Sequence, residues 1–90
     1  GVQTCALPIY AYSDSGHGWV RVPRKLLVSL GISEKITPFS YQRGDFAYLE
    51  EECDLTTFVD AYKESGKNPV FKCFYTNKQS KIRSYDRYYI

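Results

Sequence analysis

The chain has 90 residues, which is enough for one small domain but not for two with separate cores. Hydrophobic residues make up 43% of it and aromatic residues 17%, so aromatic rings supply much of the core volume. The net charge of +2 is too small to identify a nucleic-acid or membrane protein by itself. No apolar segment is long enough to span a bilayer, and we expect no membrane partner.

The first nine residues, Gly1 to Ile9, read GVQTCALPI, which is the in-frame translation of a widely used sequencing adapter, GGAGTTCAGACGTGTGCTCTTCCGATCT. The adapter ends with one unused T, and the codons of the next residue, Tyr10, begin with T. We therefore interpret residues 1–9 as an adapter-derived artefact joined to a metagenomic gene fragment whose true start is missing. We expect these nine residues to pack poorly or to lie along a sheet edge, and residues 10–90 to form a single domain.

Hydrophobic alternation predicts strands, and apolar residues three or four positions apart predict helices. Gln42 to Asp45 predicts a hairpin turn. The clearest helix follows Asp54, a good N-cap residue. Its apolar stripe consists of Leu55, Phe58, Val59 and Tyr62. In chain order the predicted elements are a strand at His17–Val22, a helix at Pro23–Leu30, strands at Ile36–Tyr41 and Phe46–Glu51, a helix at Leu55–Glu64, strands at Val70–Thr76 and Lys81–Tyr85, and a ragged or docked tail at Asp86–Ile90.

This β-α-β-β-α-β-β order predicts an α+β fold with an antiparallel sheet and two helices. Its first six elements match the split β-α-β arrangement of ferredoxin-like folds. Gly31 follows the first helix where a left-handed cap is expected. Cys53 and Cys73 show no pattern of a secreted disulfide framework, so we expect reduced thiols and a cytoplasmic protein.

The charges are distributed unevenly along the chain. Residues 50–64 hold six acids and one base, whereas residues 67–90 hold six bases and one acid. In the C-terminal third the bases alternate with aromatic residues, a composition in which cations hold phosphates and rings stack on nucleobases. The alternative is that the two charged segments are solvated and help to neutralise each other, while the aromatic residues fill a small core.

We identify no catalytic residue, metal site or cofactor from the sequence. His17 is the only histidine, and with Asp14 it forms no recognised catalytic motif. A single histidine without matched cysteines does not make a typical zinc site. The acidic run Glu50–Glu52 with Asp54 offers oxygen ligands for a hard cation, but it lacks the alternating ligands and central glycine of a calcium loop.

Much of the chain, residues 12–85, resembles small uncharacterised proteins of bacterial plasmids, integrated elements and phages. The residues that carry this resemblance are Gly16-His17-Gly18-Trp19, Val22-Pro23, Leu30-Gly31-Ile32, Tyr41, Gly44, Tyr48-Leu49-Glu50-Glu51, Asp54 and Phe58. The resemblance implies an accessory protein of a mobile element and brings no assigned activity or catalytic residue.

From this context and the absence of a catalytic constellation, we expect a non-enzymatic protein that binds and inhibits a host macromolecule, such as a CRISPR or restriction nuclease. Its partner would be a host defence protein or a nucleoprotein complex. The alternative is a binder of single-stranded nucleic acid or a cyclic nucleotide that uses the basic and aromatic C-terminal face; a third hypothesis is a small enzyme using His17. The candidate binding residues are His17, Trp19, Tyr75, Lys78, Lys81, Arg83, Tyr85 and Arg87.

Overall fold

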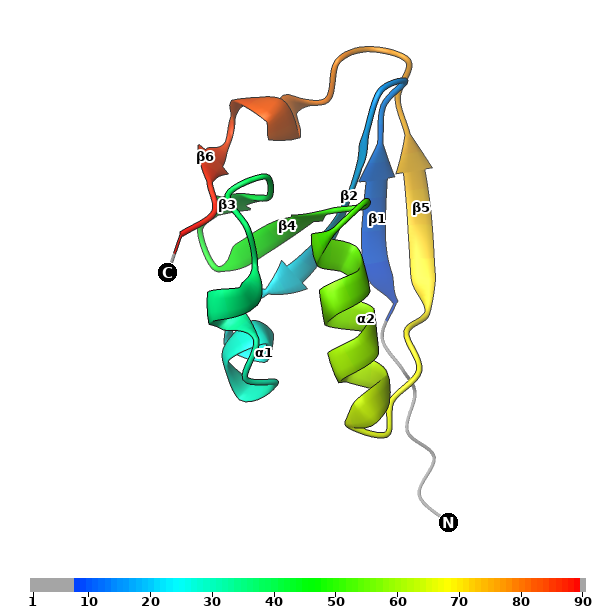
Figure 1. Ribbon diagram of the computed structural model, residues 1–90. Coiled ribbons are helices and arrows are strands. Elements are labelled where there is room, and N and C mark those ends of the chain that lie inside the picture. The colour runs from blue at the N-terminus through cyan, green and yellow to red at the C-terminus, as the bar shows by residue number, and fades with distance from the viewer. Residues whose placement is uncertain (1–7, 90) are drawn as a thin grey trace.

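The computed structural model describes residues 8–89 (Figure 1). Within them, six strands form one mixed sheet in the order β5-β1-β2-β4-β3-β6, in which only β1 and β5 are parallel neighbours. The strands are β1 (Ile9–Ser13), β2 (Gly18–Pro23), β3 (Tyr41–Arg43), β4 (Phe46–Glu50), β5 (Phe71–Tyr75) and β6 (Asp86–Arg87). The helices are α1 (Arg24–Ser29) and α2 (Asp54–Glu64), with 3-10 turns η1 (Ser33–Lys35) and η2 (Lys81–Ser84).

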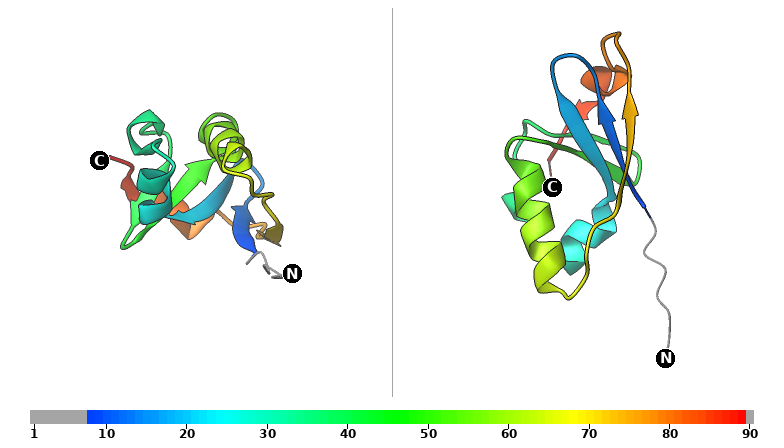
Figure 2. Two further views of the ribbon diagram at one scale, coloured as in Figure 1. Left: turned by 90° about the horizontal axis from the view of Figure 1, so that it is seen from below. Right: turned by 90° about the vertical axis from the view of Figure 1, so that its right-hand side faces the viewer.

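Both helices cover the same face of the sheet, as the view from below in Figure 2 shows. Alternate residues of the two central strands point toward them, because side chains alternate between the faces of a strand. On α1 and α2 these side chains meet Leu27 and Phe58, which are both fully buried. The sheet contributes Val20, Val22, Ala47 and Leu49 to this main core.

The opposite face carries a second, smaller core. After β5 the chain crosses to this face, where Ile82 of η2 packs on Trp19 and Tyr48. The chain then pairs β6 with β3 and buries Tyr88, whose hydroxyl donates a hydrogen bond to the Ser33 carbonyl at 2.8 Å. η2 is therefore a third layer that covers part of this face, whereas β6 extends the sheet and Tyr88 packs into the main core on the helical side.

The predicted α+β class with two helices is confirmed. The ferredoxin-like arrangement is not confirmed, because the sheet has six strands and β1 lies between β5 and β2. The strand β1 was not predicted, and its parallel pairing with β5 makes the sheet mixed rather than antiparallel. The first helix ends as expected: Gly31 has a φ of 74°, and the Ile32 N–H donates to the Leu27 carbonyl.

Two predicted strands are wrong. Residues 36–40 form no strand, because Thr37 and Ser40 turn inward to donate hydrogen bonds to the Asp54 carboxylate. Residues 81–84 form η2 instead of a strand, since the Ser80 hydroxyl accepts the Ile82 N–H and starts a 3-10 turn. The predicted tail contains β6 and a buried tyrosine.

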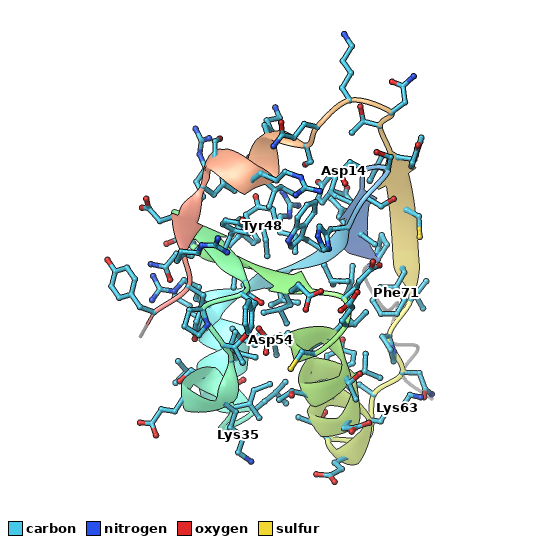
Figure 3. All side chains as sticks on the ribbon, turned by 45° about the horizontal axis from the view of Figure 1, so that its top comes forward. Asp14, Lys35, Tyr48, Asp54, Lys63 and Phe71 are labelled. Carbon is cyan, nitrogen blue, oxygen red and sulfur yellow. The ribbon has the colours of Figure 1, made fainter. Side chains whose placement is uncertain are left out.

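The prediction that Asp54 caps α2 is also wrong. The N-cap position is Cys53, and Asp54 lies in the first turn, fully buried. Its carboxylate accepts the Thr37 N–H at 3.1 Å, the Thr37 hydroxyl at 2.8 Å and the Ser40 hydroxyl. Ser40 in turn accepts the Glu50 N–H at 2.9 Å. This network ties the loop before β3 to α2 and β4; Figure 3 labels Asp54 at the start of α2.

Of the nine residues interpreted as adapter-derived, residues 1–7 lie outside the described part of the chain. Ile9 begins β1, donates its N–H to the Val70 carbonyl at 2.7 Å, and packs partly buried against the main core. For Ile9 the expectation of poor packing is therefore wrong. Cys53 and Cys73 are free and exposed, and none of the helices in residues 8–89 has the length and apolar character needed to cross a bilayer.

Replacing Asp54 by Asn should lower the free energy of unfolding by about 1–3 kcal/mol, because both hydroxyls donate to one carboxylate oxygen and an NH₂ group in place of the other oxygen faces the Thr37 N–H donor. Urea denaturation measures this change. The matched control is Asp60→Asn, an exposed acid of the same helix, which should change it by less than about 0.5 kcal/mol. Equal effects of the two substitutions would contradict the role of the network.

Candidate functional site

The turn between β1 and β2 holds the C-terminal segment through one buried carboxylate. The Arg83 guanidinium donates to Asp14 through Nε at 2.8 Å and through Nη2 at 2.9 Å. Asp14 also accepts the backbone N–H groups of Gly16, His17 and Ser80. The Arg83 guanidinium, followed by these backbone donors, holds the pKa of Asp14 far below its usual range. Figure 3 labels Asp14 at this junction.

A cleft of about 410 Å³ lies between this junction and the sheet. Trp19 contributes its edge only, because its side chain is 3% exposed and belongs to the second core. The Arg87 guanidinium stacks over the Tyr41 ring, 4.8 Å from its centroid. We call this hollow the first cleft; it is lined by His17, Trp19, Phe39, Tyr41, Glu50, Glu52, Cys53, Arg83 and Arg87.

A second cleft, of about 340 Å³, lies where β1 and β5 end beside the loop of residues 76–81. Its apolar wall is formed by Tyr12 and Phe74, whose rings stack with centroids 5.4 Å apart. Tyr75, Lys78 and Lys81 also line it. The second cleft thus combines aromatic rings with flexible cations.

Next to the second cleft, the sheet face opposite the helices carries a continuous set of rings and cations. We call it the aromatic-basic patch, and it consists of Tyr10, Tyr12, Arg21, Phe46, Lys72 and Phe74. The Arg21 guanidinium lies between two rings, 4.7 Å from the Tyr10 centroid and 4.5 Å from the Phe46 centroid. The Tyr10 ring meets the Phe74 ring edge-on at 5.4 Å. Lys72 lies 5.7 Å from the Phe74 ring.

The patch remains partly open to solvent because η2 covers only the neighbouring part of this face. Phe74 is 41% exposed, and Tyr10, Tyr12, Arg21 and Phe46 are half-buried. Deeper in the same face, burial raises the pKa of the Tyr48 hydroxyl above its usual range. The rings of the patch therefore present accessible surface on a rigid sheet.

The charged strand residues on the face of the patch are mostly basic. The strand residues whose side chains share the face of the patch include Arg21, Arg43, Lys72 and Arg87 but a single acid, Glu50, which lies in the first cleft. Among the described residues the only salt bridge is Arg83–Asp14, so no base of residues 67–89 forms an ion pair with an acid of residues 50–64, although Arg83 and Arg87 line the same cleft as Glu50 and Glu52.

The sequence-predicted site residues fall into two groups. His17, Trp19, Arg83 and Arg87 line the first cleft, whereas Tyr75, Lys78 and Lys81 line the second. Tyr85 belongs to neither cleft: its ring lies 5.0 Å from that of Tyr48 and supports the second core. Arg83 lines the first cleft while its guanidinium is engaged by Asp14, so its main role is structural.

Sequence reasoning missed the contribution of β1 to this face. Tyr10 and Tyr12 alternate with Ala11, a period of two that is typical of a strand with one aromatic face. This signal was available, but three residues are too few to predict a strand. Arg21, Phe46 and Lys72 come from three other strands, and only the strand register shows that they lie together.

Comparisons of the chain with protein-family models, with curated proteins and with solved structures found no match.

The Asp14–Arg83 junction should make stability depend on acid pH. The pKa of Asp14 is depressed in the folded state, so its contribution is present above the unfolded pKa of about 3.9 and is lost progressively as pH falls below it. Urea denaturation between pH 2 and pH 6, values spanning about two units on either side of that pKa, should show this loss, and Asp14→Asn should flatten the curve. An unchanged pH dependence in Asp14→Asn, with Asp60→Asn as the control, would contradict it.

Proposed function

We propose that this protein binds single-stranded nucleic acid on the aromatic-basic patch. The observation that carries the proposal is the position of Arg21 between the Tyr10 and Phe46 rings, on a sheet face that continues through Phe74 to Lys72. Rings that are rigid and partly exposed provide stacking surfaces for unpaired bases, and adjacent cations attract the phosphates between them.

The stacked arrangement also supports the electrostatic part of this function. A guanidinium held against aromatic faces keeps its charge and is fixed in orientation by cation–π attraction. Arg21 is half-buried, so its charge acts from within the sheet face, while Lys72 at the edge is exposed and free to follow a phosphate. This combination provides a fixed and a mobile cation beside the same rings.

The second cleft extends the path available to a strand. Tyr12 and Phe74 belong to both the patch and the second cleft, and Lys78 and Lys81 stand on the far side of that cleft. A bound strand would run from Phe46 across Tyr10 and Phe74 toward these lysines. A sheet face of this kind favours splayed single strands, because duplex grooves are usually entered by a helix or a two-stranded ribbon. The acids of α2, Asp60 and Glu64, lie on the helical layer across the sheet.

Inhibition of a host defence nuclease, and the mobile-element origin, stay predictions from the sequence. Binding of single-stranded nucleic acid is compatible with both of these predictions, because it concerns the chemistry of one surface only. A cyclic nucleotide offers only one base and one phosphate, and it therefore provides a useful comparison ligand.

Replacing Phe74 by Ala should weaken binding to a single-stranded oligonucleotide by roughly 1–3 kcal/mol, the usual contribution of one stacked base. Replacing Lys72 by Gln should weaken binding and make the slope of log K against log salt shallower by about 0.7 for each lost phosphate contact. Fluorescence anisotropy with labelled oligo(dT) and oligo(U), at low and moderate salt, measures both changes.

The matched controls are Val28→Ala and Lys63→Gln, exposed residues of α1 and α2 on the helical layer. They should leave the affinity and the salt slope unchanged. Lys78→Gln with Lys81→Gln tests the second cleft separately. Absence of saturable binding at low salt, equal effects of Lys63→Gln and Lys72→Gln, or equal affinity for a cyclic nucleotide would each overturn the proposal.

A further inference from the structure

We propose that His17, Glu50 and Glu52 form a binding site for a divalent first-row transition cation, with Zn²⁺ as the representative ion. One ligand atom from each of these side chains lies within 4.8 Å of the others. All three residues line the first cleft, whose volume of about 410 Å³ gives an ion and its water molecules access to them. The site is distinct from the aromatic-basic patch and does not depend on the proposed function.

The backbone brings these three residues together from two segments, the turn before β2 and the end of β4 with the turn that follows it. Trp19 pairs with Glu50 in the β2–β4 ladder, which places the turn before β2 beside the end of β4. The Glu51 N–H donates to the Gly18 carbonyl at 3.1 Å and continues this pairing. At the other end, the His17 N–H donates to the Asp14 carboxylate at 2.9 Å. The Glu52 N–H donates to the Glu50 carboxylate at 3.1 Å, so hydrogen bonds hold the segments that carry the three side chains beside one another.

The first cleft contains two carboxylates that converge and have no ion-pair partner among residues 8–89. Arg83 is engaged by Asp14, and Arg87 lies over the Tyr41 ring and donates to the Pro38 carbonyl at 3.5 Å. A bound dication would offset the repulsion between the two carboxylates at short range.

The donor set indicates the class of ion. One imidazole nitrogen with two carboxylate oxygens matches the nitrogen and oxygen ligands of Zn²⁺ and Mn²⁺, whereas Ca²⁺ and Mg²⁺ prefer oxygen ligands throughout. Three protein ligands leave at least one coordination position for water. The sequence offers the acidic run as oxygen ligands for a hard cation and does not connect it with His17, because the histidine comes from a distant part of the sequence.

Isothermal titration with Zn²⁺ alone tests the site. The unaltered chain should bind one ion, and His17→Ala, Glu50→Gln and Glu52→Gln should each weaken the affinity by about tenfold or more, since even substitutions outside the ligand set commonly cost that much. Mg²⁺ should bind more weakly than Zn²⁺, and its affinity should depend little on His17. Thermal unfolding without metal shows whether each variant retains its fold.

Two matched controls are available in the same segment. Glu51→Gln removes an equal charge from the neighbouring acid, which packs over Gly18 rather than lining the first cleft, and Cys53→Ser removes the nearest thiol. Both variants should bind Zn²⁺ as the unaltered chain does. The proposal is overturned if Zn²⁺ does not saturate a site, if folded His17→Ala binds with unchanged affinity, or if either control loses binding. Because no oligonucleotide is present, this result is independent of nucleic-acid binding.

Discussion

The buried carboxylate of Asp14 connects the turn between β1 and β2 to the C-terminal segment that contains η2. Its five hydrogen bonds connect the β1–β2 turn to Ser80 and Arg83, and so hold η2 against the sheet. Because η2 carries Ile82 onto Trp19 and Tyr48, the second core depends on this junction. The Asp14–Arg83 junction also determines where η2 lies. The position of η2 in turn sets one wall of the first cleft and the limit of the solvent-exposed aromatic-basic patch.

The two faces of the sheet have different physical roles. The helical face supplies the main core through aliphatic residues, Phe58 and Tyr88. The opposite face is only partly covered, and the covered part uses the aromatic residues Trp19, Tyr48 and Tyr85 in packing. The uncovered part leaves Tyr10, Phe46 and Phe74 beside cations. Some of the aromatic residues on this face therefore form the second core, and others form accessible surface. The edge of η2 separates these two groups.

Residues that looked alike in the sequence have separate roles. The sequence predicts four C-terminal cations that are available to a ligand: Lys78, Lys81, Arg83 and Arg87. In the structure the Arg83 guanidinium is bound by Asp14, whereas the two lysines are exposed beside the second cleft. The sequence predicts that Asp54 caps α2, but its carboxylate accepts hydrogen bonds from the Thr37 and Ser40 hydroxyls instead, which belong to the loop before β3. In both cases a partner distant in the sequence determined the role, and local patterns carry no information about such partners.

Local sequence signals predict the α+β class, both helices and the strands at the middle of the sheet, because hydrophobic periodicity, the Gly31 cap and the apolar stripe of α2 each lie within one short segment. They also mark His17, Lys78 and Lys81 as candidates for binding. The position of β1 between β5 and β2, the turn at residues 81–84 and the meeting of His17 with Glu50 and Glu52 emerge only in the folded chain. The physical reason is that strand order, face and side-chain convergence depend on contacts between distant segments, whose energies are set by packing and hydrogen bonding in the folded chain.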